Sequence, residues 1–218
     1  MQTIWHKPHW VILFAPTSLF REIEKETKGW AVFRQQANCS IRITRTDLQK
    51  EAANNSSQSR FVAFRDYIPR YLTASVIVVQ GVKKDESPLL TTSWITLGFP
   101  LITPSVAVWV DGNALPSVLT ADKSGKSELN EWPLNLKKKV FPIERGEGND
   151  YLNLSALFTA DGDGLFQKLV PINKTILEQS DSYLEKWRQN NKLNPTEVRK
   201  YYDWVNQYIS EAYNNTLK

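Results

Sequence analysis

Cysteine and histidine are nearly absent from this chain of 218 residues. The only cysteine is Cys39, and the two histidines, His6 and His9, both lie among the first ten residues. Thiol and imidazole groups supply most enzymatic nucleophiles, general bases and zinc ligands, so their scarcity disfavours the commonest catalytic designs and leaves a zinc site short of ligands. We therefore expect no metal and no cofactor.

Disulfides and long apolar runs are lacking as well. One thiol cannot form an intramolecular disulfide, which favours a cytoplasmic location, although several N-x-S/T sequons leave a secreted form open. The longest apolar runs, residues 10–15 and 76–79, are far shorter than the roughly 20 residues that cross a bilayer. The sequence thus predicts a soluble globular protein without a membrane span.

Charge of one sign is only slightly in excess. The formal net charge is +4 at pH 7, and the densest basic run is Lys137, Lys138 and Lys139. An excess of this size fits weak attraction to a polyanion without requiring it. Lysines also discourage aggregation at edge strands, so we interpret this run as a solvated turn or an edge strand.

Strand-like patterns dominate the middle of the chain. Before them, a strand is predicted over residues 9–15, a helix after Ser18, and a second helix over residues 60–72 that Pro69 must kink or end. The apolar runs that follow, separated by Gly, Pro, Asn and Asp, predict strands over residues 75–82, 91–99, 105–110, 117–121, 140–143, 151–160 and 165–172. The turn at residues 161–164 predicts a hairpin between the last two strands.

The final forty residues change to a helical pattern. Apolar residues at helical spacing, interrupted at residues 190–193 and restarted by Asn194 and Pro195, predict two helices. The last helix has one apolar arc, whose edge is formed by Tyr201, Trp204 and Tyr208. Aromatic residues are enriched at binding hot spots, so this edge is a candidate contact surface; packing inside the protein is the other interpretation.

Together these patterns predict an α+β fold. We expect a mixed or mainly antiparallel sheet with N-terminal helices and a C-terminal helical hairpin covering one face. An α/β sandwich that begins with a β-α-β unit is the alternative. Residues 1–172 are expected to form an α+β domain with a β-rich middle, and residues 173–218 a helical hairpin packed on it.

Catalytic motifs are incomplete. Gly125, Lys126 and Ser127 match the end of a phosphate-binding loop, but Thr120 stands where that loop needs its first glycine, and Pro133 opposes the helix that must follow. Paired carboxylates remain a possible basis for hydrolysis. The candidates in the β-rich middle are Asp111, Glu128, Glu131, Glu144, Glu147, Asp150, Asp161 and Asp163.

We therefore predict a non-catalytic interaction or assembly protein that binds a macromolecular partner, another protein or a second copy of this chain, through aromatic surfaces. The expected contact residues are Tyr201, Trp204, Tyr208, Trp5 and Trp10. A nucleic-acid-binding or nucleic-acid-processing protein is the first alternative, with phosphate contacts from Arg60, Arg65, Arg70, Lys137, Lys138 and Lys139. A carboxylate-based hydrolase is the second alternative, so an enzyme is the less favoured class.

Overall fold

The computed structural model of the protein describes residues 10–12, 61–64, 69–112 and 114–217. Its centre is an antiparallel sheet in the order β1-β3-β4-β5. The strands are β1 (Trp10–Ile12), β3 (Ser75–Gln80), β4 (Thr92–Leu97) and β5 (Val106–Trp109). A second antiparallel pair joins β2 (Phe61–Ala63) to β6 (Tyr151–Asn153).

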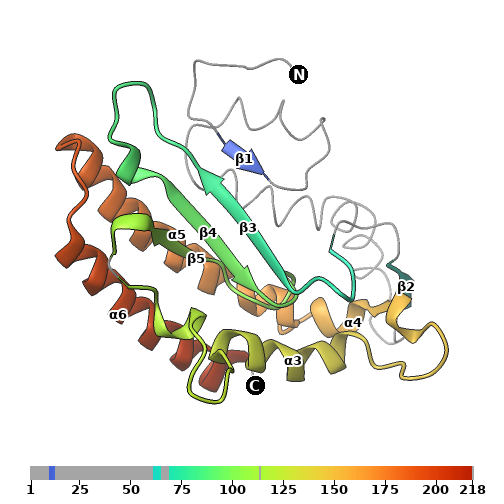
Figure 1. Cartoon of the computed structure of the whole chain (residues 1–218). Helices are drawn as coiled ribbons and strands as arrows, with labels where there is room; N and C mark the ends of the chain where they lie inside the picture. Colours follow the sequence, from blue (N-terminus) through green and yellow to red (C-terminus); the bar gives the residue numbers. More distant parts are fainter. Residues whose placement is uncertain (1–9, 13–60, 65–68, 113, 218) are drawn as a thin grey trace.

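Helices cover this sheet and its lower edge. In Figure 1, α5 (Leu165–Gln189) runs behind the main sheet, α6 (Pro195–Ala212) lies beside it, and α3 (Glu128–Val140) crosses below, close to the C-terminus. A π-helical turn, η5 (Tyr213–Leu217), continues α6, and a short helix, α4 (Leu154–Leu157), precedes α5. The remaining turns are 3₁₀ helices: η1 (Pro88–Leu90), η2 (Val110–Gly112), η3 (Ser117–Leu119) and η4 (Gly148–Asp150).

The predicted C-terminal helical hairpin is confirmed, and its ends are fixed by residues visible in the sequence. The Asn194 side chain accepts hydrogen bonds from the backbone N–H groups of the first turn of α6, and Pro195 follows it at the first helical position. Glu197 accepts a hydrogen bond from Trp187 Nε1 at 2.7 Å and also pairs with Lys186. These contacts link the start of α6 to the end of α5.

Polar side chains are embedded in the core on one face of the main sheet. Trp94 Nε1 donates to Gln80 Oε1 at 3.2 Å, and Trp109 Nε1 donates to Thr92 Oγ1 at 2.8 Å. All four residues are buried, and strand register places them on the same face. Because a buried polar group without a partner is costly, these pairs allow the face to be covered by helices.

Side chains from α5 and α6 complete the hydrogen bonding at β5, which ends the strand order. The Trp109 N–H donates to the Tyr202 hydroxyl at 3.0 Å, and that hydroxyl donates to the Trp109 carbonyl at 3.3 Å. The Ser105 N–H, just before β5, donates to Asn173 Oδ1 at 3.1 Å. An edge strand usually exposes such groups to water or to other strands, so here the helices protect the edge.

Removing the Tyr202 hydroxyl should destabilise this edge. We expect Tyr202→Phe to lower the free energy of unfolding by about 1–3 kcal/mol, because both Trp109 backbone groups lose their partner while buried. Urea unfolding followed by circular dichroism measures the change. Tyr208→Phe is the matched control and should cost under about 0.5 kcal/mol, since no hydrogen bond of that hydroxyl is found in the described part of the chain. Equal losses in the two variants would contradict the edge-protection role.

The strands predicted over residues 75–82, 91–99 and 105–110 are confirmed, but several later ones are wrong. Residues 117–121 contain the 3₁₀ turn η3, residues 140–143 begin at the last residue of α3, and residues 165–172 form the start of α5. Residues 161–164 consequently connect two helices and not two strands. Of the predicted strand at residues 151–160, only Tyr151–Asn153 is a strand.

Two of the helices in this part of the chain contain a proline, and Pro133 is the residue that opposed a helix in the sequence analysis. Pro133 lies inside α3 and Pro171 inside α5. A proline inside a helix removes one backbone hydrogen bond, and here tertiary burial of Leu129, Leu136 and Leu169 on the same helices compensates for it.

The helix predicted over residues 60–72 is also wrong where it can be checked, because Phe61–Ala63 is the strand β2.

Some expectations fall outside the residues described. They include the N-terminal helices, and the strand at residues 9–15 is seen only as Trp10–Ile12. The proposed division at residue 172 coincides with a position inside the continuous helix α5, and the two-part organisation itself stays a prediction. No helix in the described ranges has the length and apolar character that crossing a membrane requires.

Candidate functional site

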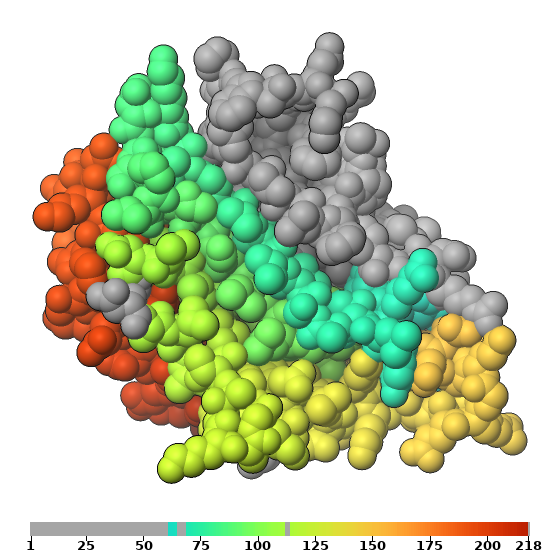
Figure 2. Space-filling model, in the orientation of Figure 1, coloured from blue at the N-terminus to red at the C-terminus, as the bar shows by residue number. Residues whose placement is uncertain are grey.

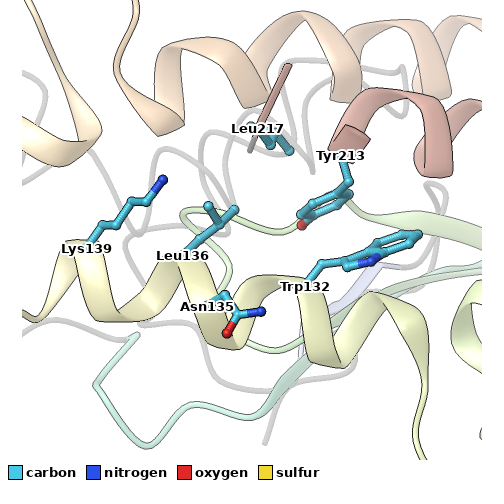
Figure 3. A pocket seen from close by; sticks show the side chains of 6 residues that line it. All are labelled: Trp132, Asn135, Leu136, Lys139, Tyr213 and Leu217. Carbon is cyan, nitrogen blue, oxygen red and sulfur yellow. The ribbon is translucent and has the colours of Figure 1, made fainter. Parts of the chain in front are cut away.

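An open cavity in the described part of the molecule lies between α3 and the C-terminal turn η5. Its volume is about 190 Å³, and we refer to it as the α3–η5 groove. Figure 3 shows side chains from both elements directed toward this space. The lining residues are Trp132, Asn135, Leu136 and Lys139 of α3 and Tyr213 and Leu217 of η5.

Helical geometry explains the α3 wall. The four lining residues stand at positions i, i+3, i+4 and i+7, which share one face of an α-helix. Another set of α3 residues, Leu129, Pro133, Leu136 and Val140, is buried and attaches the helix to the core. Leu136 belongs to both sets, so the groove borders directly on the core and is not a separate surface feature.

Tyr213 forms the opposite wall and is held rigidly. Its hydroxyl donates to the Ile102 carbonyl at 2.9 Å, and its ring stacks on Trp132 with the centroids 4.9 Å apart and the planes at 28°. Burial raises the pKa of the Tyr213 hydroxyl well above its usual range, so it stays protonated and keeps donating at neutral pH. Short π-helical segments occur often at functional sites, and here one supplies this wall.

The three consecutive lysines of α3 have three different environments. The Lys137 ammonium lies over the Tyr71 ring at 4.2 Å from the centroid, and burial lowers the pKa of this group. Lys138 is exposed and does not line the groove, whereas Lys139 is exposed and does line it. The predicted turn or edge strand is therefore wrong for this run, which forms the last turn of a helix.

The predicted aromatic edge of α6 is narrower than the sequence indicated. Tyr201 is completely buried, with its ring 5.2 Å from that of Trp109, so it faces the core and not a partner. Trp204 and Tyr208 are partly buried and stack on each other at 5.1 Å and 11°. Trp5 lies outside the described residues, and Trp10 is in β1. A partner-binding role for the remaining pair stays a prediction.

The residues of the nucleic-acid alternative are only partly visible. Arg70 is exposed, and Arg60 and Arg65 lie outside the described residues. The Gly125-Lys126-Ser127 segment is a tight turn in which Asp122 Oδ1 accepts hydrogen bonds from the Ser124 hydroxyl and from the backbone N–H groups of Ser124 and Lys126. These hydrogen bonds lower the pKa of Asp122. The donor groups of this turn therefore bind the Asp122 carboxylate and not a phosphate.

The carboxylates of the hydrolase alternative do not gather into a metal-binding cluster. Among the residues that the structure describes, no group of three or more His, Cys, Asp and Glu side chains is placed to hold an ion. Glu131 pairs with Lys126 at 3.3 Å, and Asp163 lies 3.8 Å from Lys168. Both carboxylates therefore have cationic neighbours on the surface, which is an ordinary structural arrangement.

Sequence reasoning missed the groove because it missed α3. Trp132 and Leu136 recur at helical spacing with Leu129, and this pattern was available in the sequence. Pro133 was interpreted as excluding a helix, which concealed the pattern. No sequence pattern indicated a role for Tyr213, because it follows the regular apolar arc of α6. It contacts α3 only because the chain folds the two segments together.

Comparisons with known proteins add no assignment: no family model, curated protein or solved structure matches this chain. The function must therefore be argued from the site.

Proposed function

We propose that this chain is a non-catalytic interaction protein that holds an apolar side chain of a partner protein in the α3–η5 groove. The observation that carries this proposal is an open cavity whose walls are a stacked Trp132–Tyr213 pair and the side chains of Leu136 and Leu217. Interface hot spots commonly consist of one large anchor inserted into such a pocket. The rigid aromatic wall reduces the ordering cost of binding.

The size of the cavity favours a protein partner over a small molecule. Sites that enclose small ligands and cofactors usually measure about 300–1,000 Å³ and bury most of the ligand. At about 190 Å³ and open to solvent, the α3–η5 groove has room for one large side chain. In Figure 2, α3 (yellow) lies along the lower part of the molecule and the C-terminal helices (red) lie along its left side.

Filling the groove tests the proposal. The bait is the full chain, and the probe is a phage-displayed library of random twelve-residue peptides, with retained phage then counter-selected on an Asn135→Trp variant. Asn135 is exposed and lines the groove, so the new indole occupies the cavity without truncating a core residue. We expect synthetic peptides from this selection to bind Asn135→Trp about 30-fold more weakly than the unmodified chain.

The control variant adds the same side chain outside the groove. Leu134 is exposed on α3 and does not line the cavity, so Leu134→Trp should leave peptide affinity unchanged. Circular dichroism and the unfolding midpoint confirm that both variants fold. The proposal fails when selection yields no peptide that distinguishes Asn135→Trp from Leu134→Trp.

A further inference from the structure

The α3–η5 groove is chemically asymmetric along its length. The Trp132–Tyr213 stack closes one end, and Lys139 stands at the other, two helical turns further along α3. Seven residues of helix span about 10 Å. Leu136 and Leu217 lie between these ends, so an occupant meets an aromatic wall, then an aliphatic floor, then an ammonium group (Figure 3).

Lys139 is available to a ligand. Its side chain is exposed, and no ion pair of this residue is found within the described ranges. The nearest acidic residue of α3 that also faces solvent, Glu131, is paired with Lys126 at 3.3 Å. Among the described residues that line it, the groove therefore presents an apolar surface next to a cation, and none of them carries a carboxylate.

Helix stability alone does not account for this placement. Lysines in the last turn of a helix are favoured by its macrodipole, and Lys137 and Lys138 already occupy that turn without lining the cavity. Lys139 differs from Lys138 mainly in its direction, because only one position along α3 separates them. This difference allows the two lysines to be compared experimentally.

We propose that the partner segment is acidic: a large apolar residue enters the groove, and an Asp or Glu about three residues away in an extended chain pairs with Lys139. Three residues of extended chain cover about 10 Å, which matches the distance along α3. This inference rests on the proposed function and specifies the partner of that same site. Charge complementarity at the rim contributes mainly to specificity and to the rate of association.

A nucleic acid is the less favoured occupant of the same surface. Bases bind by stacking on exposed aromatic faces, whereas one face of Trp132 is already covered by Tyr213. Lys137 lies over the Tyr71 ring, which leaves fewer lysines of α3 directed outward to phosphates. Binding of an oligonucleotide is kept as an outcome of the test.

The test uses the peptides selected against the full chain. We expect their sequences to be enriched in Asp or Glu about three positions from a Leu, Ile, Phe or Trp. One such synthetic peptide is then titrated, by fluorescence anisotropy, against the unmodified chain, Lys139→Gln and Lys138→Gln. Lys139→Gln should weaken binding about threefold to fivefold and reduce its salt dependence, the size of effect typical of an exposed ion pair.

Two controls make the outcome decisive. Lys138→Gln removes the same charge from the same helical turn, so an equal effect of both variants would reduce the role of Lys139 to net charge and overturn the inference. Groove peptides without acidic residues would also overturn it while leaving the proposed function intact, and failure to select any groove peptide would overturn the function itself. A twelve-nucleotide single strand that displaces the peptide from the unmodified chain, and not from Lys138→Gln, would assign the surface to nucleic acid instead.

Discussion

Trp109→Ala should lower the free energy of unfolding by about 3–5 kcal/mol, the usual cost of truncating a large buried aromatic residue. The Trp109 ring is 1% exposed and lies edge-on to Trp187 at 5.0 Å and to Tyr201 at 5.2 Å. Its removal opens a cavity where β5, α5 and α6 meet and leaves Thr92 without the indole donor. Urea unfolding monitored by circular dichroism measures the loss.

Trp204→Ala is the matched control for this effect. The Trp204 ring also contacts Tyr201, with the centroids 5.8 Å apart, but Trp204 is only partly buried, so its removal should cost about 1 kcal/mol. Comparing the two substitutions separates core packing from the general loss of a tryptophan. A loss below about 1.5 kcal/mol for Trp109→Ala would show that this three-element junction does not hold the fold together.

Gly164→Ala should destabilise the protein by about 3 kcal/mol, because there is no room for a methyl group at this position. Gly164 precedes α5, and an added Cβ would lie far inside van der Waals contact of the Leu157 backbone carbonyl. Backbone atoms cannot rotate aside as a side chain can, so α4 and α5 would have to separate. Thermal and urea unfolding measure the effect.

Gly125→Ala distinguishes this steric effect from ordinary backbone strain. Gly125 has a φ of +79°, but an added Cβ would meet nothing within 4 Å. Its replacement should therefore cost only about 1 kcal/mol, the penalty of a left-handed conformation. Similar losses at positions 164 and 125 would show that the close approach of α4 to the start of α5 can relax.

The local sequence was sufficient where a pattern and its end signals agreed. For the C-terminal hairpin, apolar spacing, the Asn194 cap and Pro195 all indicated the same helix boundary. The strands β3, β4 and β5 were predicted for a similar reason, since their β-branched residues are bounded by turn residues. Agreement between independent local signals is a strong indicator of the final structure, because tertiary contacts then have no local preference to override.

Where local signals conflicted, tertiary packing decided the structure. In α3, the presence of Pro133 contradicted the helical spacing, and burial of the apolar stripe outweighed the one lost hydrogen bond. Tertiary packing also decided the environment of Tyr201 in α6. An aromatic residue at the edge of the apolar arc of a helix can lie in the core or on the surface. Tyr201 lies in the core because its ring packs against Trp109.

The sequence by itself determined the fold class, the helical hairpin and the near absence of thiol and imidazole chemistry. Only the tertiary structure decided the α3–η5 groove, because Trp132 and Tyr213 are 81 positions apart and become neighbours solely through the packing of α3 against the end of α6. The tertiary structure also decided the surroundings of the three consecutive lysines of α3. Lys137 lies over an aromatic ring, Lys138 is exposed to solvent, and Lys139 lines the groove. The composition of a chain determines which chemical groups it contains. A binding site depends on which of those groups are brought together by long-range contacts.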